Sequence, residues 1–201
     1  MKKTGFILTA LVLFIALGCK QKEKTSEVKK EEVTETEKKQ PLKLKDSLRF
    51  TAFKTEQKIG VNGTFTDIQL SDFHDEKENM VDLLTGANFK INTKSIYTKD
   101  PARDAKLEKF FFENLASSEI TGKFKSFNSE KAMVQLEMNG IEKEIPFELN
   151  ATKDQVELSG SIDMIEDFSA NKAFQAIHEA CKVLHEDKTW TDVDLKIIIS
   201  K

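Results

Sequence analysis

Three side chains near the end of the chain have types that could do chemistry. His178, Cys181 and His185 stand at positions i, i+3 and i+7, which places them on one face of a helix over 173–185. A thiolate and two imidazoles suit zinc or copper. On a straight helix, however, the two histidines would lie about 10 Å apart at 1.5 Å per residue, which is too far for one metal ion to bridge. We therefore keep these residues as weak metal candidates and expect no metal or other cofactor.

Cys181 has a second interpretation, because it also belongs to an apolar stripe. The stripe comprises Ala170, Phe174, Ile177, Cys181 and Leu184, at the spacing of one buried helical face. A free cysteine in such a stripe behaves as a small hydrophobic side chain. Burial in the core, contact with a heme or metal, and a redox-reactive thiol remain open for this residue.

The other cysteine, Cys19, follows a leader-like segment. A basic start, an apolar run over 6–17 and the small residue Gly18 predict a signal peptide over 1–18. The run is shorter than the about 20 residues that a membrane-spanning helix needs. Ala16-Leu17-Gly18-Cys19 resembles the bacterial lipoprotein signal, in which the thiol is acylated. We therefore expect a lipidated Cys19; ordinary secretion with free Cys19 and an uncleaved anchor are the alternatives.

The segment after Cys19 has the composition of a spacer. Residues 20–39 hold seven Lys and six Glu and no aromatic residue, so they bury too little apolar surface to fold. We expect a disordered charged tether over 19–45 and one folded domain over 46–201. An acylated Cys19 would leave Cys181 without a partner for a disulfide bond.

Composition and motifs argue against several classes of function. The formal net charge of −3 comes from interspersed acids and bases, without the concentrated basic stripe of a nucleic-acid-binding protein. The eight glycines are scattered, so no phosphate-binding loop is formed. No Ser/His/Asp group or carboxylate pair stands in a recognisable local frame. We expect no nucleic-acid partner and no enzymatic activity, and the oligomeric state stays open.

From residue 48 onward the apolar residues alternate with a period of two, which predicts β-strands. Asn139-Gly140 between two alternating runs predicts a hairpin, and Gly160 predicts a bulge or bend. Nine ranges have a strand-like pattern, and from them we expect about eight strands: 48–55, 61–70, 81–84, 86–93, 118–127, 131–138, 141–149, 156–164 and 192–200.

Two helices are expected among these strands. Asp100-Pro101 has the pattern of an N-cap followed by proline at the first helical position, which starts a helix over 102–115. The apolar stripe around Cys181 predicts the second helix over 169–186. Short connections indicate antiparallel pairing, and closure into an eight-stranded barrel avoids open edges. Such a barrel has room for one small apolar ligand.

Several segments in order resemble the YceI-like polyisoprenoid-binding proteins. They are Phe50-Thr51-Ala52-Phe53-Lys54, Val61-Asn62-Gly63-Thr64-Phe65, Ile91-Asn92-Thr93-Lys94-Ser95-Ile96, Arg103-Asp104 with Leu107, Phe110-Phe111-Phe112, Ile120-Thr121-Gly122-Lys123-Phe124 and the hairpin Met138 to Ile145. The resemblance spans roughly 46–201. It implies a mainly β, lipocalin-like barrel of the bacterial periplasm or cell envelope, whose tunnel binds a polyisoprenoid or quinone-like lipid.

The resemblance and the apolar faces of the strands together define candidate ligand-binding residues. The chain has 15 Phe against one Trp and one Tyr, a composition that suits either a dry core or the wall of an isoprenoid channel. The candidates are Phe65, Phe89, Ile91, Phe111, Val134, Leu136, Phe147 and Leu158, with Phe111 and Phe112 over one mouth. We expect an envelope lipoprotein, anchored to a membrane through its lipid, that stores, transports or senses this lipid. The alternative is a structural or stress-response envelope lipoprotein with a self-filled barrel that acts through protein contacts.

Overall fold

The computed structural model describes residues 42–201. The expected signal peptide over 1–18, the expected lipidation at Cys19 and most of the tether over 19–45 lie outside the described residues. The strand that opens the folded unit begins at Lys45, next to the domain boundary expected at residue 46.

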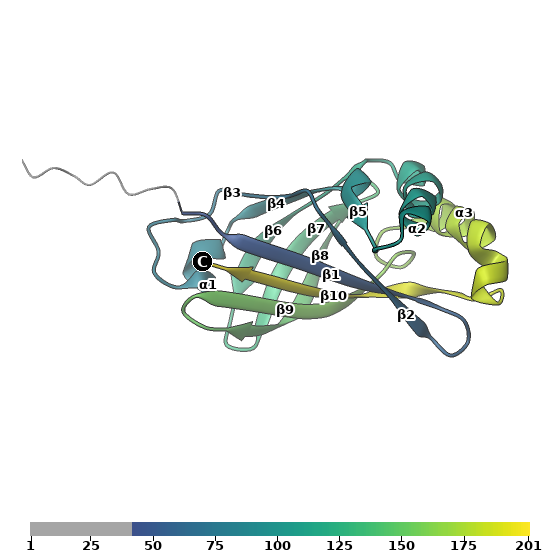
Figure 1. Cartoon of the computed structure of the whole chain (residues 1–201). Helices are drawn as coiled ribbons and strands as arrows, with labels where there is room; N and C mark the ends of the chain where they lie inside the picture. Colours follow the sequence, from purple (N-terminus) through teal and green to yellow (C-terminus); the bar gives the residue numbers. More distant parts are fainter. Residues whose placement is uncertain (1–41) are drawn as a thin grey trace, which may run out of the picture. The chain divides into compact units, whose positions relative to one another are not determined.

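Ten antiparallel strands form one curled sheet with the order β3-β4-β6-β7-β8-β9-β10-β1-β2-β5 (Figure 1). Their bounds are β1 Lys45–Lys54, β2 Ile59–Phe65, β3 Ile68–Ser71, β4 Asn88–Asn92, β5 Ile96–Tyr97, β6 Glu119–Phe127, β7 Lys131–Met138, β8 Ile141–Ala151, β9 Gln155–Asp163 and β10 Thr189–Ser200. The mainly β, antiparallel architecture is confirmed.

The expected number of eight strands is wrong, because two long strands are interrupted. The segment expected as one strand over 61–70 is divided between β2 and β3, and β4 is separated from β5 by the 3-10 turn η1, Thr93–Ser95. Backbone hydrogen bonds cross the breaks, from Thr66 N to Ser95 O at 3.0 Å and from Asn92 N to Asp67 O at 3.1 Å. Since β2 runs on into β3 and β4 runs on towards β5, the chain itself connects the two ends of the strand order. The sheet thus curls into a half-barrel.

Three α-helices accompany the sheet, one more than expected. Helix α1, Met80–Leu84, occupies the stretch predicted as a strand over 81–84, so that prediction is wrong. A short apolar run does not reveal its period, and here Asn79 decides the conformation. Its side-chain oxygen accepts a hydrogen bond from Asp82 N at 2.9 Å, which is the geometry of an N-cap.

The other two helices lie where the sequence predicts them, with irregular ends. Asp100 caps helix α2, Pro101–Lys106, by accepting from the backbone of Ala102 and Arg103. Beyond α2 the coil widens into the π-helical turn η2, Leu107–Phe111, and then tightens into the 3-10 turn η3, Phe112–Asn114. Helix α3 spans Asn171–Cys181 and continues as the 3-10 turn η4, Lys182–His185. None of the helices in residues 42–201 has both the length and the apolar character needed to cross a bilayer.

The turn at Asn139-Gly140 is confirmed as a tight hairpin. Both residues have positive φ, 55° and 74°, and Met138 pairs with Ile141 across the turn. The Asn139 side chain also donates to the carbonyl oxygens of Phe168 and Ser169 at 3.0 and 3.2 Å. The hairpin is therefore tied to the segment that leads into α3.

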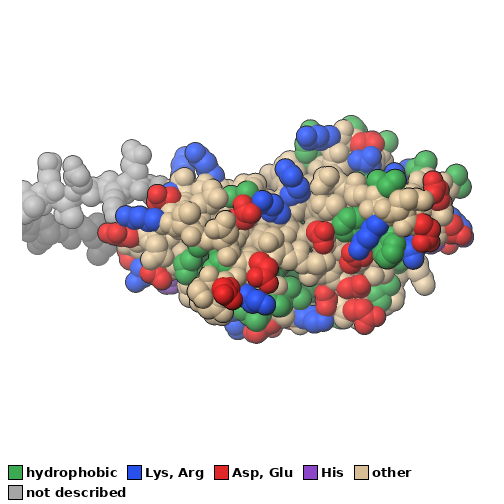
Figure 2. Space-filling view, turned by 90° about the horizontal axis from the view of Figure 1, so that it is seen from below, with side chains coloured by type: hydrophobic (Ala, Val, Ile, Leu, Met, Phe, Trp, Pro, Cys, Tyr) green, Lys and Arg blue, Asp and Glu red, His purple; other side chains and the backbone are tan. Residues whose placement is uncertain are grey.

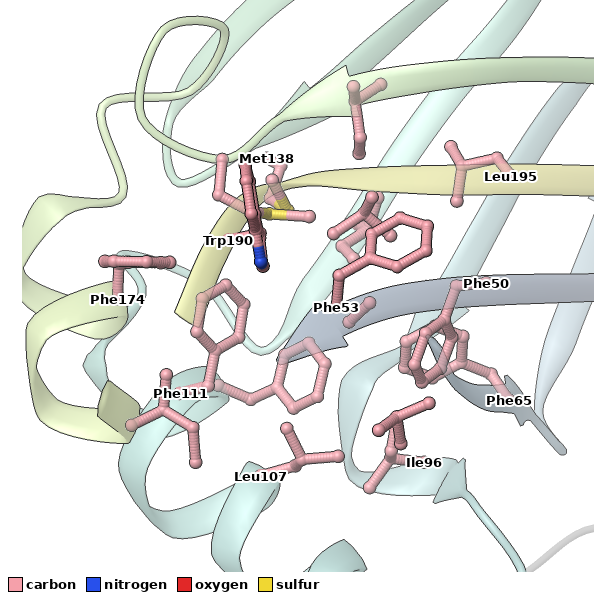
Figure 3. A pocket seen from close by; sticks show the side chains of 18 of the residues that line it. Phe50, Phe53, Phe65, Ile96, Leu107, Phe111, Met138, Phe174, Trp190 and Leu195 are labelled. Atoms are coloured by element: carbon pink, nitrogen blue, oxygen red, sulfur yellow. The ribbon is translucent and has the colours of Figure 1, made fainter. Parts of the chain in front are cut away.

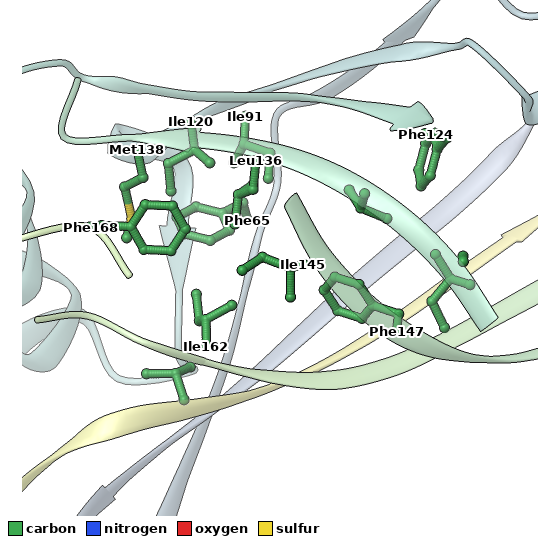
Figure 4. Close-up of a cluster of buried hydrophobic side chains, with 14 of the residues drawn as sticks. Phe65, Ile91, Ile120, Phe124, Leu136, Met138, Ile145, Phe147, Ile162 and Phe168 are labelled. Carbon is green, nitrogen blue, oxygen red and sulfur yellow. The ribbon is translucent and has the colours of Figure 1, made fainter. Parts of the chain in front are cut away.

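The core runs along the inside of the curled sheet (Figure 4). At the end covered by α1, Leu83 and Leu84 are fully buried and Phe124 is 2% exposed. The backbone of α1 is hydrogen-bonded to the turn between β8 and β9, from Met80 N to Lys153 O at 3.0 Å. Helices α2 and α3 lie at the opposite end (Figure 1). On the outer face that Figure 2 shows, acidic and basic side chains are interspersed.

Candidate functional site: an apolar cavity below two helices

A cavity of about 520 Å³ lies between the inner face of the sheet and the helices α2, η2 and α3 (Figure 3). Its size falls within the about 300–1,000 Å³ typical of small-molecule sites. Most of the wall consists of aromatic and aliphatic side chains from alternate positions of the strands, capped by side chains of the helices. Labelled examples in Figure 3 are Phe50, Phe53, Phe65, Ile96, Leu107, Phe111, Met138, Phe174, Trp190 and Leu195.

The structure brings seven of the eight candidate ligand-binding residues to this wall. They are Phe65, Phe89, Ile91, Phe111, Val134, Leu136 and Phe147. Phe112 lines it too, beside Phe111 on the helical side. Leu158 is not a wall residue; it is fully buried in the packed core. That these side chains contact a ligand stays a prediction.

Sequence reasoning missed the contribution of β1 and β10. The alternating residues Leu48, Phe50 and Ala52 on β1, together with Leu195 and Ile197 on β10, face the cavity. Their alternation was visible in the sequence. What was missing was the pairing of the first strand with the last, Phe50 opposite Leu195, which places both apolar faces on one wall.

Several phenylalanine rings of the wall occupy space left by glycines on the neighbouring strands. Phe50 pairs with Gly63, and a Cβ on this glycine would lie 2.2 Å from the Phe50 ring. Phe89 pairs with Gly122, where a Cβ would lie 2.2 Å from the Phe89 ring. A ring can lie flat against the strand only where the cross-strand residue lacks a side chain. The phenylalanine rings thus line the cavity without filling it.

Gly160 belongs to the same pattern, and the bulge or bend expected there is not formed. Its pairing with Leu195 continues in regular register along β9 and β10. A Cβ at this position would lie 2.8 Å from Cδ1 of Phe147. The absence of a side chain therefore makes room for Phe147 and does not bend the strand.

A chain of aromatic contacts connects the sheet with the helical cover. The ring of Phe65 lies 5.8 Å from that of Phe50 and 5.7 Å from that of Phe112, measured between centroids. Phe112 in turn meets Phe111 edge to face at 5.2 Å. Such tilted and T-shaped pairs are the favoured geometries of aromatic rings. They fix the helical turns η2 and η3 over the cavity.

Polar side chains reach the cavity at its mouth, where β1 and β10 meet α2 and η4. The charged or polar residues of this mouth are Lys54, Asp100, Arg103, Lys106, His185 and Thr189. Leu184, which also lines the cavity, is 61% exposed, so the cavity opens to solvent beside η4. The arrangement is an apolar chamber with a charged rim.

The three weak metal candidates are not gathered as a ligand set. Nδ1 of His178 and Nδ1 of His185 both lie 3.1 Å from the same Thr189 hydroxyl, and Nε2 of His178 lies 3.5 Å from Asp187. Cys181 is buried on the cavity wall as part of the apolar stripe. Within residues 42–201, no group of three or more His, Cys, Asp or Glu is placed to hold a metal ion. Hydrogen bonding to Thr189 explains the positions of both histidine rings.

His185 lies in a positive environment. Burial lowers the pKa of this histidine below its usual value, and the electrostatic influence of Lys54, His178, Lys106 and Arg103 lowers it further. Both effects disfavour the protonated ring. The neutral form of His185 is therefore favoured at the mouth.

These features define a class of protein: an antiparallel half-barrel with an apolar chamber of the size and lining that suit a hydrophobic small molecule. The chain matches the YceI-like domain family over residues 24–198. It therefore belongs to the YceI-like family, as its sequence resemblance indicated.

Two solved structures are similar in fold. A polyisoprenoid-binding domain from Saccharophagus degradans, implicated in plant cell wall breakdown, has a TM-score of 0.55 at 14% identity, over 77% of this chain and 91% of that one. BcnA from Burkholderia cenocepacia has a TM-score of 0.54 at 11% identity, over 78% of this chain and 96% of that one. No curated protein matches the chain in sequence.

Proposed function

We propose that this protein binds a hydrophobic lipid of the polyisoprenoid type inside its half-barrel and that it serves in storage, transport or sensing of that lipid. The cavity of about 520 Å³ with its aromatic and aliphatic wall is the observation that carries this proposal. The polyisoprenoid-binding domain of similar fold supports the choice of lipid. A quinone-like lipid has the same kind of apolar tail and is included in the class.

The chemistry of the wall favours a long tail. Burial of one methylene group contributes about 0.8 kcal/mol, whereas association costs roughly 4–15 kcal/mol in lost freedom of motion. A tail needs about twelve buried carbons before burial matches the middle of that range. We therefore expect affinity to rise about fourfold for each carbon added until the cavity is full.

The first experiment asks whether the cavity holds lipid. Protein purified gently from the native envelope is extracted with organic solvent, and the extract is analysed by mass spectrometry. A prenyl lipid at near-stoichiometric amount is the expected result. Repeated recovery of empty protein would contradict the proposal and favour the alternative role through protein contacts.

A matched pair of variants assigns the binding to the cavity. Ala52 lines the chamber on β1, and Ala52→Phe places a ring in the ligand space. Ala105 on α2 is exposed, so Ala105→Phe adds the same ring outside the chamber. Trp190, the single tryptophan of the chain, lies on the cavity wall and reports binding by its fluorescence. We expect Ala52→Phe to lose at least about tenfold in prenol affinity and Ala105→Phe to bind as the parent protein does.

We further propose that the protein is a lipoprotein of the bacterial cell envelope. The sequence Ala16-Leu17-Gly18-Cys19 behind an apolar run supports this proposal. Metabolic labelling with a fatty-acid analogue tests it, with Cys19→Ser as the matched variant. We expect the parent protein to carry the label and to stay in the membrane fraction, and Cys19→Ser to be unlabelled and released. If neither protein took up the label and both fractionated in the same way, anchoring through Cys19 would be contradicted.

A further inference from the structure

The mouth of the cavity carries more positive than negative charge. Lys54 closes β1 opposite Thr189 of β10, and Arg103 and Lys106 stand one turn apart on α2. All three are half-buried wall residues, together with one carboxylate, Asp100. Two separate elements thus direct cations to one rim.

The two lysines of the rim lack a protein counter-charge. Arg103 is paired with Asp100, with Nη2 3.3 Å from Oδ2. In residues 42–201, neither Lys54 nor Lys106 takes part in an ion pair, although pairs such as Lys196–Glu157 at 2.8 Å occur elsewhere on the sheet. Lys54 and Lys106 are half-buried beside an apolar wall, so their charges are only partly hydrated. Two unpaired lysines at the edge of an apolar chamber therefore form a site suited to an anionic group.

The charges of Lys54, Lys106 and Arg103 all influence the same part of the mouth, the surroundings of His185. Lys54, Lys106 and Arg103 all contribute, after burial, to the lowered pKa of His185. These three side chains come from β1 and α2, so two elements direct their charges towards His185 of η4. Beyond this rim, towards the strands, the wall is formed mainly by apolar side chains.

We propose that the bound lipid has an anionic head group, a phosphate or a carboxylate, which lies between Lys54, Arg103 and Lys106 while its tail occupies the chamber. Arginine presents a planar fork of donors that fits both oxyanions, and lysine adds a compact charge. A neutral alcohol or quinone head would leave the two lysines unpaired. This inference rests on the proposed lipid binding and specifies which head group the site selects.

The test compares three ligands with one tail: geranylgeranyl phosphate, geranylgeranoic acid and geranylgeraniol. Binding is followed by Trp190 fluorescence on the full, delipidated protein. We expect each anionic ligand to bind at least about tenfold more tightly than the alcohol, and the excess to shrink as salt is raised. The ratio between phosphate and acid then identifies which of the two anions the site prefers.

A charge-removing variant assigns the effect to the rim. The double variant Lys54→Gln with Lys106→Gln keeps most of each side chain and removes both charges. Its matched control is Lys94→Gln with Lys172→Gln, at exposed positions away from the cavity. We expect the rim variant to lose about tenfold for the anionic ligands and to keep its affinity for geranylgeraniol, which also shows that it is folded. The control keeps both affinities.

The possible failures are separable. Equal affinity for alcohol and anions, or a rim variant that binds the anions as well as its control does, would overturn the head-group inference and leave lipid binding intact. Inorganic phosphate that binds as tightly as geranylgeranyl phosphate would overturn it too, because the tail would then play no part. Loss of binding for all three ligands would overturn the proposed function itself.

Discussion

The two ends of the half-barrel are built from the same kinds of side chain and differ in what those side chains do. At the α1 end, Met80, Leu83 and Leu84 are fully buried and Phe124 is 2% exposed, so the interior is solid. At the end covered by α2 and α3, the side chains of Phe111 and Phe174 border a cavity of about 520 Å³. Apolar residues thus form a core at one end and a wall at the other.

The difference arises from how each helix meets the sheet. Helix α1 is only five residues long and is hydrogen-bonded to the turn between β8 and β9, and its residues Met80, Leu83 and Leu84 are fully buried. At the other end, η2 packs against α3, and the pair covers the mouth from outside. The side chains of α1 therefore fill the interior at their end, whereas η2 and α3 lie over the opposite end and leave a cavity below them.

The largest expected effect is a loss of stability on substitution of a core residue at the α1 end. Phe124 lies between Phe89 and Phe127, with ring centroids at 5.4 and 6.2 Å, and does not line the cavity. Phe124→Ala should lower the free energy of unfolding by about 3–5 kcal/mol, because a void forms where packing is complete. Urea denaturation measures this loss. A loss below about 1 kcal/mol would mean that the α1 end is not a packed core.

A smaller effect on stability is expected for the same substitution at the open end. Phe174 of α3 borders a space that already exists, so its removal creates little new void. Phe174→Ala should cost about 1 kcal/mol or less in stability and should weaken prenol binding by several-fold, since the ligand loses an aromatic contact. Parallel urea and fluorescence titrations of Phe174→Ala and Phe124→Ala give the contrast. Equal stability losses would erase the distinction between the two ends.

The smallest effect concerns pH. Because the pKa of His185 is lowered on folding, by burial and then by Lys54, His178, Lys106 and Arg103, the unfolded chain binds the proton more readily. The contribution of His185 to stability is complete above its unfolded pKa of about 6.5 and is lost as pH falls through the folded pKa. Between pH 7 and 5, the melting temperature of His185→Gln should therefore fall less than that of the parent.

A control histidine distinguishes this effect from a general response to acid. His74 is exposed and lies outside the cavity, so His74→Gln should follow the parent curve over the same pH range. Calorimetric melting at several pH values makes the comparison. If the melting temperatures of His185→Gln and His74→Gln fell equally with pH, the mouth would not lower the pKa of His185.

The elements with strong local signals were predictable from the sequence. The hairpin at Asn139-Gly140 follows from two residues that tolerate positive φ, and the start of α2 follows from the cap at Asp100 and proline at position 101. The alternation along Val134 and Leu136 gave the inward face of β7 correctly. Local signals failed at α1, where five residues are too few to reveal a period.

The sequence by itself determined the strand pattern, the family and most of the apolar residues that face inward, because alternation and turn chemistry are properties of neighbouring residues. Tertiary structure alone decided which inward residues border empty space. Leu158 and Leu136 belong to the same alternating pattern, yet one is fully buried in the core and the other lines the chamber. Their difference depends on which helix covers each end of the sheet. The charged rim was likewise decided by the tertiary structure. Lys54 of the first strand lies at the same rim as Arg103 and Lys106 of α2 because folding brings together segments that are far apart in sequence.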